Sequence, residues 1–172
     1  MAENEEAAPA EAKNEAEASS GGASVGVMKE GEYLLHVLIE TGKNISLEGE
    51  DTVDPLIKVS FMGKNKQTTA KDNCTRSTQM KWDEHLFLET GKVGSKEVEE
   101  GLIEIEILNK GFFKSDLIGY FPISAPTIYN MKEHLVHNQQ LAFTNPLAED
   151  KARISGYVTV SIQLTGPGDS AS

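Results

Sequence analysis

The sequence has a single cysteine, few basic residues and no long apolar run, and each shortage excludes a class of protein. Cys74 is the only cysteine, which excludes an intrachain disulfide and a cysteine-based zinc site. Lys and Arg number 16 against 27 Asp and Glu, and the net charge of −11 argues against general nucleic-acid binding, which needs a basic surface. The longest apolar run, 33–39, is interrupted by His36 and is too short to cross a bilayer.

Targeting and catalytic motifs are also missing. The chain starts without the basic region and apolar core of a signal peptide, so we expect a soluble protein of a reducing compartment, in the cytoplasm. It has no Gly-x-Ser-x-Gly elbow, no Cys–His setting and no Gly-rich phosphate loop. His134 and His137 stand three residues apart beside Glu133, but no third histidine is near, which favours a solvated helix face over a metal site. We therefore expect no enzymatic activity.

The N-terminal segment is acidic and nearly free of apolar side chains. Residues 1–24 hold six Glu and one Lys and, apart from alanines and Met1, no apolar residue. Such a segment cannot bury enough surface to offset its ordering entropy. We expect a disordered acidic tail over residues 1–28, one folded domain over 29–166 and a flexible tail over 167–172.

Within the domain, apolar and polar residues alternate as in strands that bury one face. The clearest case is Ile103, Ile105 and Ile107, which alternate with two glutamates. The same period marks 33–39, 56–61, 82–88, 117–123 and 158–164, and residues 62–65 are typical of a hairpin turn into a strand at 66–71. We expect Trp82, the one tryptophan, to lie in the core.

Only residues 127–141 have a helical pattern, with Ile128, Met131 and Leu135 on one stripe. The sequence therefore predicts an all-β fold. We expect an antiparallel β-sandwich of eight strands with one short helix between the last two.

An acidic loop precedes the strand at 56–61. It holds Glu48, Glu50, Asp51 and Asp54, and Pro55 biases Asp54 away from the helical region, so the chain leaves the loop extended. An acid fixed at the start of a strand can act as an oxygen ligand for calcium. The alternative is a solvated acidic turn.

Four segments, in order, resemble those of a C2 domain. They are 53–59, the Trp82-Asp83-Glu84 strand, Ser115-Asp116-Leu117-Ile118-Gly119 and the final strand 156–164, and the match spans about residues 30–168. Segments 54–64 and 156–169 are most similar to C2 domains of the ferlin type. Ferlins carry several C2 domains and a membrane anchor, whereas we expect one C2-like domain and no anchor in this sequence. The resemblance therefore implies a type of domain and not a whole ferlin: a β-sandwich that binds partners without catalysis.

C2 domains bind calcium through five carboxylates on loops at one end of the sandwich. The resemblance places the corresponding site on Glu48, Asp54, Asn109 and Asp116. Asn109 and Gly111 stand where acids are expected, with Lys110 between them, so three charges replace five. Affinity follows the number of charged ligands, so we expect calcium binding at about millimolar or weaker and no other cofactor. In the alternative, Lys110 or Lys114 pairs with the first-loop acids and replaces the ion.

Two further features suit a binding surface. The stretch 58–82 is locally basic, and C2 domains commonly use a basic patch on these strands to hold anionic lipid headgroups or acidic protein surfaces. The alternative is a solvated strand face that its edge lysines keep soluble. The segment Lys110-Gly111-Phe112-Phe113-Lys114 resembles a wedge for an apolar surface, although at least one phenylalanine could instead plug the sandwich. The candidate lipid- or partner-binding residues are Lys58, Lys64, Lys66, Lys71, Lys110, Phe112, Phe113 and Lys114.

The sequence thus predicts a module that docks on anionic phospholipid membranes, largely independently of calcium. The alternative is a C2 fold used for protein interaction or as a scaffold on an acidic surface, for example the cytoskeleton. A net charge of −11 repels anionic bilayers and keeps this alternative open. In either case we expect a cytoplasmic protein, peripheral on a membrane or on the cytoskeleton.

Overall fold

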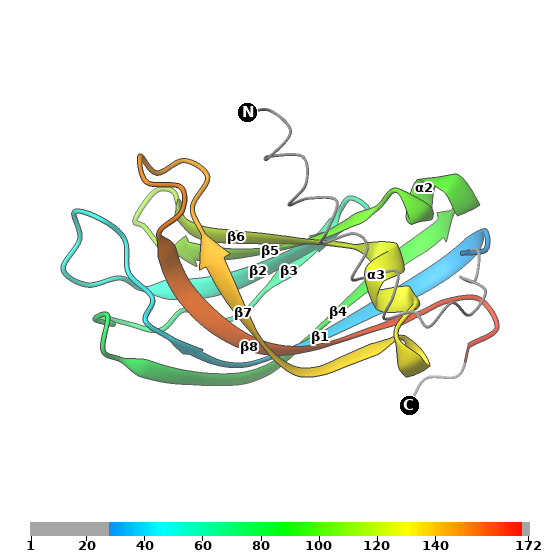
Figure 1. Cartoon of the computed structure of the whole chain (residues 1–172), viewed down its shortest axis with the longest axis horizontal. Coiled ribbons are helices and arrows are strands. Elements are labelled where there is room, and N and C mark those ends of the chain that lie inside the picture. Colours follow the sequence, from blue (N-terminus) through cyan, green and yellow to red (C-terminus); the bar gives the residue numbers. More distant parts are fainter. Residues whose placement is uncertain (1–27, 170–172) are drawn as a thin grey trace, which may run out of the picture.

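The computed structural model describes residues 28–169, which form eight strands and three short helical segments (Figure 1). The elements are β1 (Gly31–Lys43), β2 (Pro55–Phe61), β3 (Lys64–Gln67), β4 (Gln79–Val93), α2 (Ser95–Glu99), β5 (Leu102–Asn109), β6 (Asp116–Ser124), α3 (Ala125–Tyr129), the 3-10 helix η1 (Lys132–His134), β7 (Leu135–Thr144) and β8 (Ile154–Thr165). Residues 1–27 and 170–172, which carry most of the two predicted tails, lie outside the described residues.

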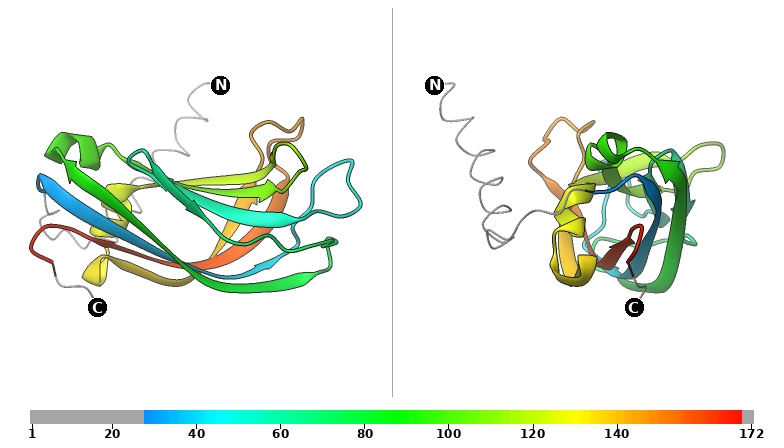
Figure 2. Two further views of the ribbon diagram at one scale, coloured as in Figure 1. Left: turned by 180° about the vertical axis from the view of Figure 1, so that it is seen from behind. Right: turned by 90° about the vertical axis from the view of Figure 1, so that its right-hand side faces the viewer.

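The strands form two layers. Hydrogen bonds join them in the order β3-β2-β5-β6-β7-β8-β1-β4, and every pair is antiparallel. Only Tyr120 and Thr144 pair β6 with β7, so the sheet divides there into β3-β2-β5-β6 and β7-β8-β1-β4. These layers face each other, as the two views of Figure 2 show. The predicted eight-stranded β-sandwich is confirmed.

The core lies between the layers and follows the alternation in the sequence. Ile103, Ile105 and Ile107 are fully buried, whereas the glutamates between them are partly exposed. Alternating residues of β1 and β8 are also buried: Leu35, Val37, Ile39, Val158, Val160 and Ile162. Trp82 is 6% exposed, as expected of a core aromatic, and its Nε1–H donates to the Thr69 carbonyl at 2.8 Å.

The helix predicted over residues 127–141 is wrong for most of its length. α3 ends at Tyr129, and Leu135 already pairs with β8. The register of β7 against β8 shifts between Val136 and Gln139, and this irregularity interrupts the two-residue period that would have marked a strand. Pairing with β8 therefore overrides the helical stripe, and the short helix lies between β6 and β7 rather than between the last two strands.

The hairpin after β2 is confirmed but is tighter than predicted. Met62 and Gly63 alone form the turn, with φ of 49° and 79°, the left-handed pair that suits the twist of a two-residue hairpin. β3 consequently begins at Lys64 and ends at Gln67, so the strand predicted at 66–71 is displaced toward the turn.

Residues at both ends of the described chain make specific contacts with the sandwich, and the predicted domain bounds of 29–166 stay a prediction. Met28 is 1% exposed, and the Ser95 hydroxyl donates to its carbonyl at 2.6 Å. At the other terminus, Asp169 accepts hydrogen bonds from the Tyr129 hydroxyl and the Gly166 N–H, both at 2.8 Å. Specific hydrogen bonds therefore hold both ends of the described chain.

The topology gathers four loops at one end of the sandwich, called the loop end here. They are residues 44–54, 68–78, 110–115 and 145–153, which follow β1, β3, β5 and β7 (Figures 1 and 2). The opposite end carries the Met62–Gly63 turn, α2, α3 and η1. Between residues 28 and 169 no helix is long and apolar enough to span a membrane.

Candidate functional site: the loop end

Two phenylalanines project from the loop between β5 and β6. Phe112 is 95% exposed and Phe113 is 94% exposed, and their rings touch edge to face with centroids 4.9 Å apart. Gly111 permits the tight turn beneath them, because a β-carbon there would overlap the Lys114 carbonyl oxygen. The alternative in which one ring plugs the sandwich is wrong, since neither ring is buried.

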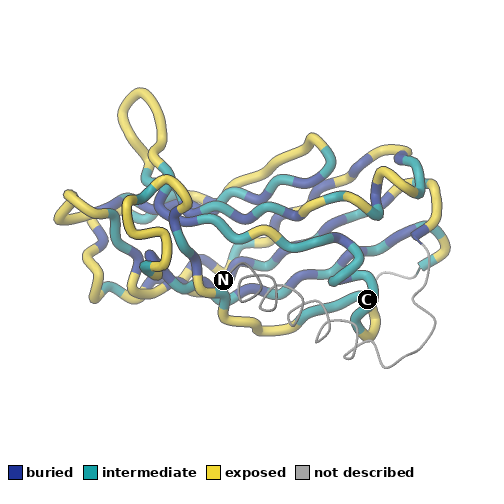
Figure 3. Tube along the Cα trace, turned by 45° about the horizontal axis from the view of Figure 1, so that its top comes forward, coloured by how far each residue is buried: buried dark blue, intermediate teal, exposed yellow. Residues whose placement is uncertain are grey.

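A third apolar side chain lies at the same end, and the sequence did not reveal it. Leu147, in the loop between β7 and β8, is 80% exposed. The Asn145 side chain donates to the Leu117 carbonyl at 2.9 Å and accepts from the Leu147 N–H at 2.9 Å. Asn145 thus ties this loop to the start of β6, beside the phenylalanine loop. The loops at this end are largely exposed (Figure 3). The only sequence signal was an apolar residue outside any periodic segment.

Lys110 and Lys114 flank the phenylalanines and are exposed. Within residues 28–169 neither lysine forms an ion pair with Glu48, Asp51 or Asp54. The arrangement in which a lysine replaces the calcium ion by pairing with these acids is therefore not observed.

Three of the four predicted calcium positions meet at the base of the loops. Asp54 donates its N–H to the Asn109 side-chain oxygen at 2.8 Å, and Asn109 pairs across the ladder with Asp116. The Asp54 carboxylate accepts the Asn73 N–H at 2.7 Å. Two of the predicted ligand oxygens thus join the first loop to its neighbours through hydrogen bonds.

Glu48, the fourth predicted position, lines a different hollow. That hollow measures about 210 Å³ and is also lined by Leu147 and Arg153 from the β7–β8 loop. Among residues 28–169, no three or more His, Cys, Asp or Glu side chains are grouped so as to hold a metal ion.

The predicted basic residues do not form one patch. Lys58 lies directly opposite Glu106 of β5, so an acid adjoins it on the same face. Lys64 and Lys66 pair with two buried residues of β2 and therefore point to the other side of the sheet. A cluster that is continuous in sequence becomes two surfaces because neighbouring residues on a strand alternate between its faces.

The remaining basic residues of that stretch are also separated. The Lys71 ammonium lies 5.9 Å from the centroid of the Trp82 ring, near the loop end. Lys81 forms an exposed ion pair with Asp83 at 3.3 Å, on the outer face of the other layer.

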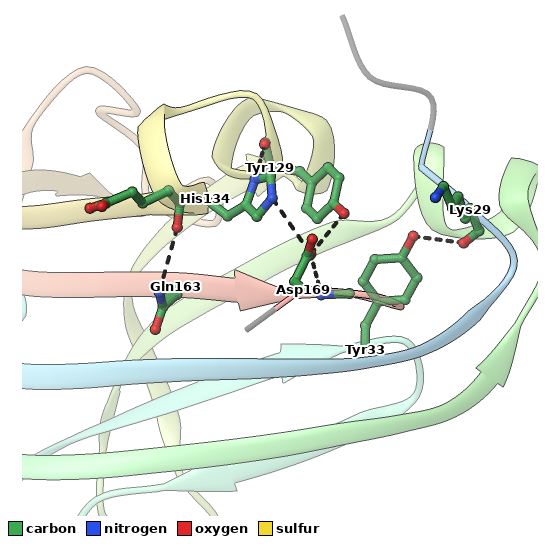
Figure 4. Close-up of polar contacts among 8 residues, drawn as sticks. Lys29, Tyr33, Tyr129, His134, Gln163 and Asp169 are labelled. Atoms are coloured by element: carbon green, nitrogen blue, oxygen red, sulfur yellow. Dashed lines mark hydrogen bonds and ion pairs between the residues drawn. The ribbon is translucent and has the colours of Figure 1, made fainter. Parts of the chain in front are cut away.

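The two histidines considered as metal ligands are not on one helix face. His134 stacks on Tyr129, with ring centroids 3.9 Å apart, and its Nε2 lies 3.5 Å from Asp169 (Figure 4). His137 instead belongs to β7. Burial and the hydrogen bond to Asp169 raise the pKa of Tyr129 far above its ordinary value of 10.0, so its hydroxyl stays a donor. This cluster holds the C-terminal end of the described chain against α3.

No protein-family model matches the chain. Solved structures of C2 domains are similar to it. The SMP–C2A–C2B fragment of extended synaptotagmin 2 is similar with a TM-score of 0.57 and 10% identity, over 87% of this chain and 30% of that one. The C2A domain of a plant extended synaptotagmin 1 gives a TM-score of 0.55 and 12% identity, over 79% of this chain and 96% of that one. Human GIVD cytosolic phospholipase A2 gives a TM-score of 0.51 and 12% identity, over 83% of this chain and 18% of that one.

The chain therefore has the fold of a C2 domain and spans less than a third of the extended synaptotagmin 2 fragment. At these identities the likeness concerns the fold alone. The closer resemblance to ferlin-type C2 domains stays a prediction.

Proposed function

We propose that the chain is a non-catalytic C2 module that docks on anionic phospholipid membranes through its loop end, largely independently of calcium. The exposure of Phe112 and Phe113, 95% and 94%, carries this proposal. Aromatic rings that contribute nothing to the core and stand together at a loop apex suit an apolar phase outside the protein. Leu147 adds a third apolar contact from a loop that Asn145 holds in place.

Lysines flank this apolar surface. Lys110 and Lys114 adjoin the phenylalanines in sequence and are exposed. A lysine near an anionic membrane contributes about 1 kcal/mol, and burial of a phenylalanine about 1.5 to 3 kcal/mol. Apolar insertion therefore supplies most of the affinity in this proposal, and the lysines favour anionic over neutral lipid.

The hydrogen bonds at the loop base support independence from calcium. A calcium ion would need the Asp54 carboxylate and the Asn109 oxygen as ligands, and both already accept backbone N–H groups. An ion there would share these oxygens with the backbone N–H groups in a site with few charged ligands, which favours weak affinity. The loops are joined without the ion.

A second candidate, a protein-interaction domain, follows from the acidic surface. Glu104 and Glu106 face outward on β5, and the Tyr120 hydroxyl donates to Glu104 at 2.5 Å, which raises the pKa of Tyr120 to about 12. Together with the net charge of −11, these acids oppose close contact with an anionic bilayer. The phenylalanine pair would then enter an apolar pocket of a partner protein.

Vesicle co-sedimentation separates the candidates. The full chain is incubated with phosphatidylcholine vesicles that contain or lack phosphatidylserine, in calcium or in chelator. We expect binding to the anionic vesicles to be equal with and without calcium, and weaker binding to neutral vesicles. Binding in calcium alone would refute calcium independence, and no binding in either condition would favour the protein-interaction candidate.

A further inference from the structure

The outer face of the layer β7-β8-β1-β4 is hollowed beside the loop end. The hollow measures about 400 Å³, within the usual range of small-ligand sites of roughly 300 to 1,000 Å³. It is formed by β1, β4, β7 and β8, and its lining includes Thr41, Lys43, Lys81, Gln140, Tyr157 and Thr159. It lies on the opposite layer from Lys58 and does not involve the phenylalanine loop.

The strand register arranges the lining in two rows. Lys81, Thr41, Thr159 and Gln140 stand side by side across β4, β1, β8 and β7, and Gln79, Lys43 and Tyr157 form the next row. Register shifts between Ile39 and Thr41 set this arrangement: β1 carries the extra residue against β8, and β4 carries the extra residue against β1. Gly42 faces the core, where a β-carbon would lie 2.8 Å from Trp82 Cζ3. The register shifts therefore turn Thr41 and Lys43 toward the hollow.

The hollow is locally basic in an acidic protein. None of the lining residues between 28 and 169 is acidic, and both Lys43 and Lys81 border it. Among the described residues Lys43 has no ion pair, and its ammonium lies 5.9 Å from the centroid of the Tyr157 ring. The Lys81–Asp83 pair is exposed on both sides, 75% and 54%, so water screens it and an anion can compete for Lys81. The hollow thus attracts negative charge.

The neutral side chains define the rest of the ligand. Thr41, Thr159, Gln79 and Gln140 offer hydroxyl and amide groups that both donate and accept hydrogen bonds. The Tyr157 ring adds one flat apolar surface. A ligand that matches the whole hollow carries phosphate for the lysines and hydroxyls for the neutral groups.

We propose that this hollow binds a phosphorylated polyol, with the chemistry of an inositol phosphate. The ligand could come from the headgroup of a phosphoinositide lipid or from the soluble inositol phosphate. The lipid source rests on the proposed function, because the hollow reaches a bilayer only when the loop end docks on it. The soluble source does not.

Calorimetric titration of the full chain with inositol trisphosphate tests the proposal, with inositol and inorganic phosphate as comparison ligands. The variant Lys43→Gln/Lys81→Gln removes the two charges of the hollow. Its matched control, Lys64→Gln/Lys66→Gln, removes two exposed lysines of β3 on the other layer. A Thr159→Val variant removes one hydroxyl at nearly constant shape.

We expect wild type to bind the trisphosphate at least about tenfold more tightly than inositol or phosphate. The Lys43→Gln/Lys81→Gln variant should lose about tenfold or more, Thr159→Val a smaller factor, and the control pair less than about twofold. The absence of binding by wild type, or an equal loss in both lysine pairs, would overturn the site.

Two further measurements distinguish the lipid headgroup from the soluble inositol phosphate, and the ligand site from the membrane-docking proposal. Trisphosphate binding by a Phe112→Ser/Phe113→Ser variant should equal that of wild type, because these rings lie outside the hollow. If that variant and wild type bind the trisphosphate while neither binds vesicles, the hollow stands and membrane docking fails. If phosphoinositide in the vesicles strengthens docking and Lys43→Gln/Lys81→Gln abolishes the gain, the lipid headgroup is the source.

Discussion

Replacement of both phenylalanines at the loop apex by serine tests the membrane-docking proposal most directly. Phe112 and Phe113 are 95% and 94% exposed, so the folded protein loses almost no buried apolar surface when they are removed. On a membrane each ring would bury most of its surface, which is worth about 1.5 to 3 kcal/mol per ring. Together they supply about 3 to 6 kcal/mol, and about 1.4 kcal/mol already changes a dissociation constant tenfold.

The Phe112→Ser/Phe113→Ser variant should therefore bind vesicles containing phosphatidylserine at least about tenfold more weakly than wild type in a co-sedimentation titration. Its melting temperature should stay within about 2 °C of wild type, since a loss of 1 kcal/mol shifts a domain of this size by about 2 to 4 °C. Leu102→Ser is a matched control, because Leu102 is 48% exposed and begins β5 at the end opposite the loops. That control should bind vesicles like wild type.

Two results would refute the reasoning. Vesicle binding within about twofold of wild type would show that the rings do not enter the membrane, and any docking would then use another surface of the domain. A fall in melting temperature of more than about 5 °C would show that the rings pack in the fold after all.

Three other measurements test calcium binding, the N-terminal segment and the pH dependence of stability. Calorimetry should find no calcium dissociation constant in the micromolar range, and excess calcium should scarcely raise the melting temperature, whereas a true site at a hundredfold excess would add about 2.7 kcal/mol. Deletion of residues 1–24 should leave the unfolding free energy unchanged and strengthen binding to acidic vesicles at low salt; equal binding would show that this acidic segment does not compete for the lysines. Burial lowers the pKa of His36 below 6.5, and so does His85, whose Nδ1 lies 2.8 Å from His36 Nε2. As the pH falls, His36 is protonated at a higher pH in the unfolded chain than in the folded chain, so the unfolding free energy should fall below about pH 6.5. In denaturant titrations, His36→Gln should flatten that fall.

The elements that the sequence predicted well are those with an unbroken two-residue period. Ile103, Ile105 and Ile107 are buried as expected, because each faces the core of a regular strand. β7 escaped prediction because its register shifts between Val136 and Gln139, and no local signal distinguishes such an irregularity from a helical stripe.

The site was predictable only where it is local. Phe112 and Phe113 are adjacent between two lysines, so one short segment revealed them. The hollow on the outer sheet combines Lys43, Lys81 and Tyr157, which come from three strands far apart in the sequence. Only the strand register and the bulge in β1 place them together. Conversely, residues that are close in the sequence can be separated by the fold: Lys58 and Lys64 lie on opposite faces of one hairpin.

The hydrogen bonds at the loop end also explain how docking could proceed without an ion. The Asp54 carboxylate joins the first loop to the second through the Asn73 N–H, and the Asn109 side chain joins the third loop to the first through the Asp54 N–H. Asn145 adds the fourth loop through the Leu117 carbonyl. Polar groups that accept backbone N–H groups in this way fix the loops before any partner arrives, which lowers the entropy cost of binding. Under the proposed function, a loop end held by its own side chains would present its apolar residues with or without calcium, so its binding would be set by the composition of the partner surface.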